Sequence, residues 1–186
     1  MKYHKNSFGA AGSRKVQGGL DFYETPGKAI QGLLRNEEFP GTVWEPACGA
    51  GAISDVLQSA LGPDNIQCSD INPQGNGAQF DFLRGKYPGE RPDHIITNPP
   101  FNMAEAFLVQ SKKYARKKVA FMLRLLWLES KKRYPMFHDK LFPLKAVYVF
   151  PNRIQMKGDE SGLVAFAWYV WDKEWKGEPV IRWIMT

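Results

Sequence analysis

The stretch TVWEPACGAG, residues 42–51, decides the fold of this chain. Its opening TVWE is β-branched or apolar up to a final Glu, which is typical of a buried strand that reaches the edge of a sheet. A turn of small residues follows, and residues 52–57 then place apolar side chains at helical spacing. Strand, glycine-rich turn and helix form the first half of a nucleotide-binding α/β unit, where small residues let a ligand approach the backbone.

The turn differs from two common phosphate-binding motifs. It is not a P-loop, because no Gly-Lys-Ser/Thr follows, and it is not the dinucleotide fingerprint, because the third glycine and its spacing are wrong. A glycine turn after a strand is also often only a tight turn. Other segments must therefore decide between a ligand site and a simple connection.

The second informative stretch is Asn98-Pro99-Pro100-Phe101, which follows a β-branched, apolar run at residues 93–97. That run is typical of a buried strand, and the two prolines end the sheet ladder and stiffen the turn. Ligands of open α/β sheets bind beyond the carboxyl ends of the strands. An amide oxygen and a proline carbonyl can accept both hydrogens of an amino group there, while the aromatic ring stacks on a planar base. The alternative is a proline-stiffened loop with a core phenylalanine.

Two acidic residues complete the pattern. Asp70 ends the strand expected at residues 66–70, about twenty residues after the glycine turn, where an acid can accept hydrogen bonds from ribose hydroxyls. Asp81 is followed by Phe82, and such a pair can take an adenine amino group and cover a ring face. The alternatives are a helix-capping acid at Asp70 and an edge-strand acid at Asp81. The four features together, in this order, favour a nucleotide-type site.

Strands and helices alternate from residue 42 to about residue 126, which predicts an α/β fold with a parallel sheet covered on both faces. Pro26 begins an amphipathic helix over residues 26–34, and further helical segments are expected at 103–114 and 129–138. Strands are expected at 147–150 and 163–171, and residues 180–184 are expected to close the sheet as an edge strand. Residues 1–20 are rich in Gly, Ser and basic residues, which predicts a mobile arm.

Composition indicates one soluble globular domain, since 44% of the 186 residues are hydrophobic and 24% are charged. Two cysteines cannot build a disulfide framework, and the N-terminus lacks the apolar core of a signal peptide, so a cytoplasmic location is expected. No apolar run approaches the length of a membrane-spanning helix. The three histidines, His4, His94 and His138, are isolated, so no metal site is predicted.

Charge is distributed unevenly along the chain. Residues 41–100 hold three basic and seven acidic side chains, a net charge of −4, whereas residues 101–186 hold sixteen basic and eight acidic, a net charge of +8. The basic half is typical of a protein that contacts nucleic-acid phosphates. Lysines on helix surfaces are also commonly just solvated, so fewer than half of these are expected to touch a nucleic acid.

With these motifs in place, the chain resembles the S-adenosylmethionine-dependent N6-adenine DNA methyltransferases, in particular the small phage-type enzymes, over residues 21–183. The resemblance implies a class I (Rossmann-like) methyltransferase fold with a mostly parallel, seven-stranded sheet and helices on both faces. It further implies that S-adenosylmethionine is bound by the first cofactor motif, the glycine motif, the ribose acid and the adenine-ring motif, here Tyr23, Thr25, Pro26, Glu45, Ala47, Gly49, Gly51, Asp70, Ile71, Asp81 and Phe82.

The resemblance also implies the chemistry. Asn98, Pro99, Pro100 and Phe101 correspond to the catalytic tetrapeptide, which holds a flipped-out adenine for methylation of its N6 amine. The acceptor is expected to contact Arg124, Lys131, Lys132, Arg133, Arg153 and Lys157. Two departures from the family stand out: the chain has no room for a separate target-recognition domain, and Met156 replaces an aromatic that often follows the arginine at position 153.

Residues 21–186 are accordingly expected to form one methyltransferase domain acting on DNA. The alternatives are the same chemistry on RNA adenine or on a protein glutamine amide, or a catalytically silent nucleic-acid-binding subunit. The basic second half favours nucleic acid over protein, and the intact Asp70, Asp81 and Asn98 favour an enzyme. The sequence does not define the recognition site or the oligomeric state.

Overall fold

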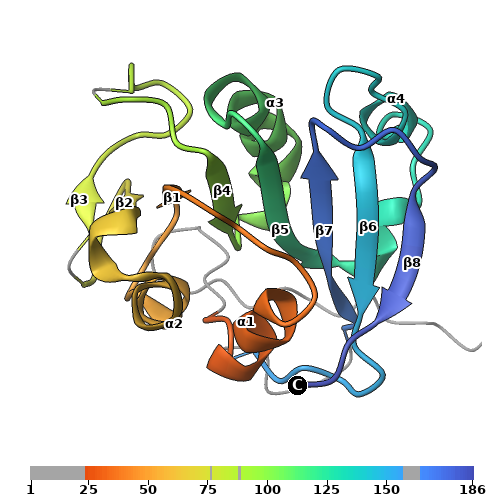
Figure 1. The fold of residues 1–186 in the computed structure, drawn as a ribbon, viewed down its shortest axis with the longest axis horizontal. Helices are drawn as coiled ribbons and strands as arrows, with labels where there is room; N and C mark the ends of the chain where they lie inside the picture. The colour runs from red at the N-terminus through yellow and green to blue at the C-terminus, as the bar shows by residue number, and fades with distance from the viewer. Residues whose placement is uncertain (1–23, 76, 88, 157–163) are drawn as a thin grey trace, which may run out of the picture.

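The computed structural model describes residues 24–75, 77–87, 89–156 and 164–186. Figure 1 shows one twisted sheet with helices on its two faces. The expected N-terminal arm, Tyr23 and Lys157 lie outside the described residues. The helices are α1 (Gly27–Leu34), α2 (Ala52–Leu61), α3 (Ala104–Tyr114) and α4 (Tyr134–Phe137); the strands are β1 (Val43–Glu45), β2 (Ile66–Asp70), β3 (Ala78–Gln79), β4 (His94–Thr97), β5 (Lys118–Arg124), β6 (Leu144–Val149), β7 (Phe166–Asp172) and β8 (Val180–Trp183).

The sheet of the described residues has eight strands in the order β3-β2-β1-β4-β5-β7-β6-β8. Strands β3, β2, β1, β4 and β5 run parallel, β7 is antiparallel to both β5 and β6, and β8 is parallel to β6. The predicted α/β fold is confirmed. The predicted mostly parallel sheet of seven strands needs correction to a mixed sheet of eight. The expected edge strand β8 is present, and the two-residue strand β3 at the opposite edge is an addition.

Local sequence explains where the first elements begin. Pro26 lies in extended backbone at the start of α1, where its missing N–H costs nothing. Strand β1 ends at Glu45, and the chain turns through Gly49 and Gly51, which have positive φ angles of 51° and 99°. Gly51 is the residue that precedes α2, so a side chain at that position would be strained.

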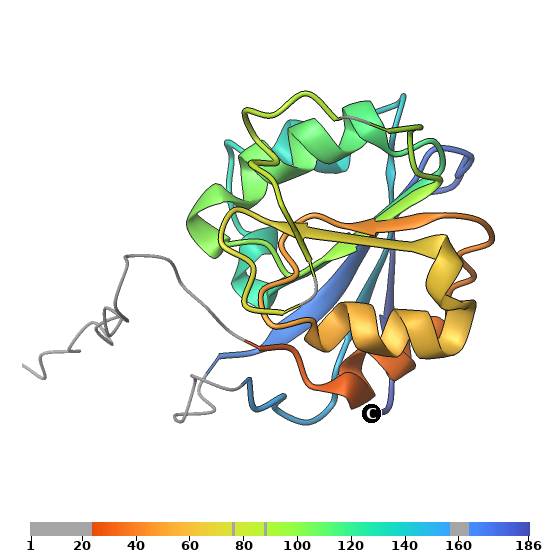
Figure 2. The same cartoon turned by 90° about the vertical axis from the view of Figure 1, so that its left-hand side faces the viewer.

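The core lies on both faces of the sheet. Helices α1 and α2 cover one face and α3 covers the other, as Figure 2 shows from the side. Alternate residues of β7 serve the two layers: Trp168 and Val170 pack with α1 and α2, whereas Tyr169 and Trp171 pack on the opposite side. Because both faces are covered, all residues of β7 are buried, which explains the almost continuous apolar sequence there.

An ion-pair cluster lies at the amino-terminal edge of the parallel strands. Glu37, which is only 4% exposed, contacts Lys118 Nζ at 2.9 Å and Lys145 Nζ at 2.8 Å. Tyr148 Oη donates a third hydrogen bond to its carboxylate at 2.5 Å. Asp172 lies 3.7 Å and 3.5 Å from the same two lysines. These contacts lower the pKa of Glu37 against the opposing effect of burial, so this carboxylate is held in its charged form.

In the part of the chain that the structure describes, no helix is both long and apolar enough to cross a membrane.

Candidate active site

The carboxyl ends of three parallel strands bring the predicted site residues together. Register pairs Glu45 of β1 with Cys68 of β2, and Trp44 of β1 with Ile95 of β4. Glu45, Asp70 and Asn98 therefore end or follow neighbouring strands at one edge of the sheet, and all three line the same pocket. This is the edge at which open α/β sheets bind ligands.

Asp70 fixes the shape of the glycine turn. One of its carboxylate oxygens accepts a hydrogen bond from Gly49 N at 2.9 Å, and the other accepts one from Asn72 N at 2.8 Å. The turn is closed further by Cys48 N, which donates to Ser69 O at 3.0 Å. Each carboxylate oxygen of Asp70 keeps a second lone pair, so the residue can position the turn and still accept hydrogen bonds from a ligand.

The pair Asp81 and Phe82 forms a second wall of the pocket. The Oδ1 atom of Asp81 accepts hydrogen bonds from Leu83 N at 3.0 Å and Arg84 N at 3.1 Å, which fixes the turn and leaves Oδ2 for other contacts. Phe82 is buried against Trp44 and Phe107, with ring centroids 5.0 Å and 4.9 Å away. The predicted adenine-ring motif is thus a rigid wall rather than a mobile loop.

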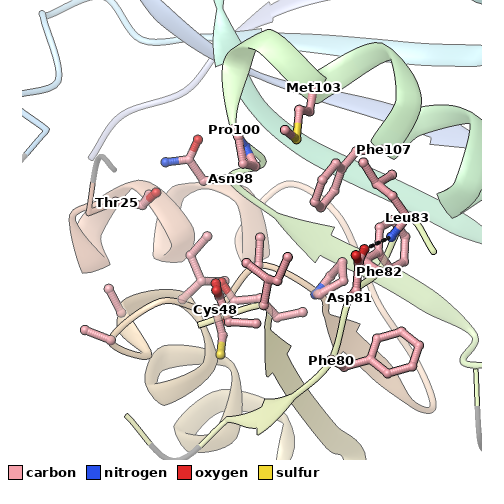
Figure 3. Close-up of a pocket in the computed structure, with 18 of the residues that line it drawn as sticks. Thr25, Cys48, Phe80, Asp81, Phe82, Leu83, Asn98, Pro100, Met103 and Phe107 are labelled. Carbon is pink, nitrogen blue, oxygen red and sulfur yellow. Dashed lines mark hydrogen bonds between the residues drawn. The ribbon is translucent and has the colours of Figure 1, made fainter. Parts of the chain in front are cut away.

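Figure 3 shows this pocket between the sheet edge and α3. We name it the cofactor pocket because residues predicted to bind the cofactor line it. Four carboxyl side chains line it, and no lysine or arginine does among the described residues. Predicted cofactor residues on its wall are Thr25, Glu45, Ala47, Asp70, Ile71, Asp81 and Phe82; Gly49 and Gly51 shape the adjoining turn, and Pro26 starts α1. The wall also includes Glu24, Pro46, Cys48, Ala50, Ala52, Ile53, Phe80, Leu83, Asn98, Pro100, Met103 and Phe107.

Glu45 is the most perturbed acid of the pocket. It is 1% exposed, and its Oε2 atom has no hydrogen-bond partner in the described part of the chain. Burial raises the pKa of its carboxyl to about 8, and the neighbouring charges of Asp70 and Asp55 add to this, while Ser54 lowers it in part. Glu45 is therefore protonated at neutral pH in the free protein, and a cationic ligand in the pocket would favour its ionised form.

This raised pKa predicts a specific pH dependence of stability. The folded protein holds the Glu45 proton more tightly than the unfolded chain does, so the free energy of unfolding falls as pH rises from about 4.5 to about 8. Glu45→Gln removes this loss of stability at higher pH, because the amide does not ionise. We expect urea unfolding to show equal stability near pH 4.5 and a variant more stable by roughly 2–4 kcal/mol near pH 8. A difference that does not change with pH would contradict the buried, protonated state.

The tetrapeptide separates the cofactor pocket from a second pocket. Asn98 and Pro100 line the cofactor pocket, whereas Phe101 lines the other together with Arg124, Leu126, Trp127, Glu129 and Arg133. Met103 N donates a hydrogen bond to Pro100 O at 2.9 Å, which fixes the turn into α3, and Pro99 is buried. We call the second cavity the acceptor pocket because Arg124 and Arg133, which line it, are predicted to contact the acceptor. The predicted catalytic residues thus lie between two cavities, with the amide on one side and the ring on the other.

The basic residues predicted to contact the acceptor do not behave alike. Arg133 donates hydrogen bonds to Trp127 O at 2.8 Å and Glu129 O at 2.9 Å, and its guanidinium lies 3.5 Å from Glu105. Arg133 therefore braces the acceptor-pocket wall. The others differ: Arg124 lies over the Phe101 ring, Lys132 pairs with Glu105 on the surface, Lys131 and Arg153 are exposed, and Lys157 is not described.

Several wall residues escaped the sequence analysis. Met103 precedes α3 and Phe107 lies in its first turn, four positions later. This spacing places two side chains on the same face of a helix, so the sequence could have indicated that both line one site. Phe80 adjoins the predicted Asp81. Trp127 lies beside Arg124 only because residues 125–128 turn back in a 3-10 helix after β5, and no sequence pattern indicated this. Met156, noted as a departure, is a buried core residue.

The strand order, the glycine turn and the pocket at the carboxyl edge belong to an α/β fold that solved methyltransferase structures share. Searches of protein-family models and of curated proteins gave no match for the sequence. Solved structures do match. The chain is similar to the modification subunit of a candidate type I restriction enzyme from Vibrio vulnificus, with a TM-score of 0.62 and 15% identity, covering 88% of this chain and 47% of that one.

Two further structures share the fold. A candidate class I S-adenosylmethionine-dependent methyltransferase from Listeria monocytogenes matches with a TM-score of 0.61 and 12% identity, over 84% of this chain and 62% of the other. A candidate RNA methyltransferase from Pyrococcus horikoshii matches with a TM-score of 0.60 and 18% identity, over 83% and 87%. The chain thus spans about half to two thirds of the first two proteins and most of the third.

Proposed function

We propose that this protein transfers a methyl group from S-adenosylmethionine to the N6 amine of adenine in DNA. The observation that carries the proposal is the position of Asn98-Pro99-Pro100-Phe101 between an acidic cofactor pocket and an aromatic, arginine-containing acceptor pocket. A methyl transfer needs a donor and an acceptor held on opposite sides of one small group of residues, because the nucleophile must approach in line with the bond that breaks.

The charge of the cofactor pocket selects among nucleotide-like cofactors. The carboxylates of Glu24, Asp70 and Asp81 line it beside the protonated Glu45, and the described residues add no cation to the wall. Such a pocket repels the phosphates of NAD or ATP and attracts a cation. S-adenosylmethionine fits, since it carries a sulfonium and an ammonium group and no phosphate. Two buried polar atoms of the wall, Glu45 Oε2 and Thr25 Oγ1, have no partner among the described residues and offer acceptors that a ligand can satisfy.

The residues that would hold the cofactor follow from the wall. Asp70 would accept hydrogen bonds from the ribose, Asp81 from the adenine amine, and Glu45 and Thr25 would be partners of the polar methionine end. Phe82 and Ile71 would supply apolar contacts for the adenine ring. When bound, S-adenosylmethionine supplies an electrophilic methyl group on a positively charged sulfur.

The tetrapeptide would prepare the acceptor. The exocyclic nitrogen of adenine is a poor nucleophile because its lone pair is delocalised into the ring. Asn98 Oδ1 and the Pro99 carbonyl would each accept one of its N–H groups, which draws the nitrogen towards tetrahedral geometry and exposes the lone pair. Phe101 would stack on the base, which must leave the helix to reach this depth. The excess proton leaves readily once the nitrogen carries the methyl group and a positive charge.

Two observations favour a nucleic-acid acceptor. The net charge of residues 101–186 is +8, and the exposed Lys131 and Lys132 follow the acceptor pocket directly. Two structural neighbours, the modification subunit of a candidate restriction enzyme and a candidate RNA methyltransferase, also have names that refer to nucleic-acid chemistry. RNA adenine is the second candidate, because the acceptor pocket would contact a base and the described residues offer no contact specific for a deoxyribose.

Asp81→Asn tests the cofactor assignment at one atom. The amide keeps an oxygen for the Leu83 and Arg84 turn and replaces Oδ2 by an NH₂ group, which cannot accept from the adenine amine. We expect calorimetry to show roughly tenfold weaker binding of S-adenosylmethionine, with unchanged unfolding temperature. The control ligand is an analogue of S-adenosylmethionine with purine in place of adenine, which lacks the amine. The variant should bind this analogue as tightly as the wild-type protein does. Equal losses for both ligands would reject the proposed contact.

The reaction is tested with purified protein and isotopically labelled S-adenosylmethionine, offered separately to duplex DNA, single-stranded DNA, RNA and a glutamine-containing peptide. Digested nucleosides are identified by mass. Labelled N6-methyladenine in DNA supports the proposal. Label in RNA alone would show that the same reaction takes place on the second candidate, RNA adenine. Cofactor binding without label in any nucleic acid, or label in the peptide, would overturn it.

A further inference from the structure

The ring of Phe101 is already in contact with a planar group. The guanidinium carbon of Arg124, the last residue of β5, lies 4.7 Å from the centroid of the ring. Phe166, the first residue of β7, is a further neighbour, with ring centroids 5.7 Å apart and an interplanar angle of 33°. A guanidinium is flat and delocalised, as a nucleobase is, so Arg124 takes a position over the ring that a stacked acceptor base would need.

The side chain of Arg124 is weakly held. Its Nε atom is buried and has no hydrogen-bond partner among the described residues, and Arg124 forms no ion pair with any described carboxylate. Arg133, on the same pocket wall, has two carbonyl acceptors and Glu105. Because its buried Nε lacks an acceptor in the described part of the chain, the guanidinium of Arg124 would gain hydrogen bonds by moving towards an anion.

The backbone around Arg124, in contrast, is fixed. Tyr169 Oη donates to the carbonyl oxygens of Arg124 and Leu125 at 3.1 Å each, and Leu125 N donates to Ala165 O at 2.7 Å. A rotation of the side chain therefore leaves the strand and the pocket wall in place. The exchange is also balanced in energy, because a cation–π contact and a base-on-aromatic stack have stabilisations in the same range.

We propose that Arg124 gates the acceptor pocket. In the free protein its guanidinium covers the ring of Phe101; entry of the base displaces it, and it then binds a phosphate of the same nucleic acid. The inference rests on the proposed nucleic-acid acceptor. It gives Arg124 a second role, control of access to the Phe101 ring, besides its predicted contact with the acceptor. An acceptor without phosphate must compete with the guanidinium for the face of the Phe101 ring. A polynucleotide competes in the same way, but its phosphate forms an ion pair with Arg124 once the guanidinium is displaced.

Two probes separate these effects, free deoxyadenosine and a short adenine-containing DNA duplex, each titrated without cofactor. For Arg124→Met we expect the affinity for deoxyadenosine to rise at least about threefold, because the guanidinium no longer covers the ring. The affinity for the duplex should fall about five- to tenfold, with a salt dependence shallower by about one phosphate contact. Arg124→Lys, which keeps the charge without the flat group, should show the rise for deoxyadenosine and a smaller loss for the duplex.

A control removes one positive charge at the opposite edge of the sheet, where Lys173 is exposed after β7. Lys173→Met should change neither affinity by more than about twofold. Opposite signs for the two probes support the gate, since a distorted pocket lowers both affinities. Unchanged or weaker binding of deoxyadenosine by Arg124→Met rejects it.

These titrations are independent of methyl transfer. If the variants behave as expected and the wild-type protein methylates no nucleic acid, the gate stands and the proposed reaction fails. If the wild-type protein methylates DNA and the deoxyadenosine affinity does not rise in Arg124→Met, the reaction stands and the gate fails.

Discussion

Asn98→Ala is expected to lower methyl transfer by at least about 10²–10³-fold at saturating acceptor, while cofactor binding stays within about twofold of wild type. The amide lines the cofactor pocket at the end of β4, next to Pro100, and the neighbouring tetrapeptide residues lead into the acceptor pocket. Its oxygen would act on the acceptor amine, so its loss affects the transition state more than the binding of either ligand. Single-turnover rates with preformed complexes measure this directly.

Asn98→Asp is the matched variant. It keeps an acceptor oxygen in the same place and should retain more activity than Asn98→Ala. If Asn98→Ala instead keeps turnover within about fivefold of wild type, the amide does not prepare the amine. If both variants lose cofactor binding and transfer to the same extent, Asn98 is a cofactor residue and the catalytic assignment is wrong.

Glu37→Ala is expected to lower the free energy of unfolding by about 3 kcal/mol or more, because it leaves two lysines without their main partner in a buried site. The side chains of Lys118 and Lys145 are 15% and 18% exposed, and of the described carboxylates only Asp172, at 3.5–3.7 Å, remains to offset their charges. Tyr148 Oη loses its short hydrogen bond to the carboxylate as well. Urea unfolding at neutral pH measures the change.

A surface ion pair provides the comparison. Lys132 Nζ lies 2.6 Å from Glu105, closer than either lysine lies to Glu37, and its side chain is 78% exposed. Lys132→Ala should cost less than about 1 kcal/mol, because exposed pairs are screened and cost side-chain entropy. Burial rather than distance therefore decides the size of the effect. Similar losses for Glu37→Ala and Lys132→Ala would contradict this account of the cluster.

Local sequence was sufficient for the parts of the fold that depend on neighbours along the chain. The strand–turn–helix at residues 42–61 follows from an apolar run, two glycines that adopt positive φ, and helical spacing. The convergence of Glu45, Asp70 and Asn98 also follows, since parallel strands that alternate with helices place their carboxyl ends at one edge. The two-residue strand β3, which has no apolar pattern, could not be predicted this way.

Contacts between distant segments were beyond the sequence. Glu37 meets Lys118 and Lys145 across separations of 81 and 108 residues, and no local pattern marks such a pair. The run Lys131-Lys132-Arg133 appears uniformly basic, yet Arg133 is built into the pocket wall while its neighbours face solvent. The contact of Arg124 with Phe101 likewise depends on the pairing of β4 with β5, which brings the ends of the two strands together.

The most direct test of the central claim is the identity of the nitrogen that receives the methyl group. A DNA duplex containing adenine labelled with ¹⁵N at the exocyclic position is incubated with S-adenosylmethionine labelled with ¹³C at its methyl group, and the digested nucleosides are studied by NMR. We predict a methyl signal split by one-bond coupling to the labelled nitrogen, absent from the Asn98→Ala sample. A ¹³C methyl group without that coupling, or none in the DNA, would contradict the account.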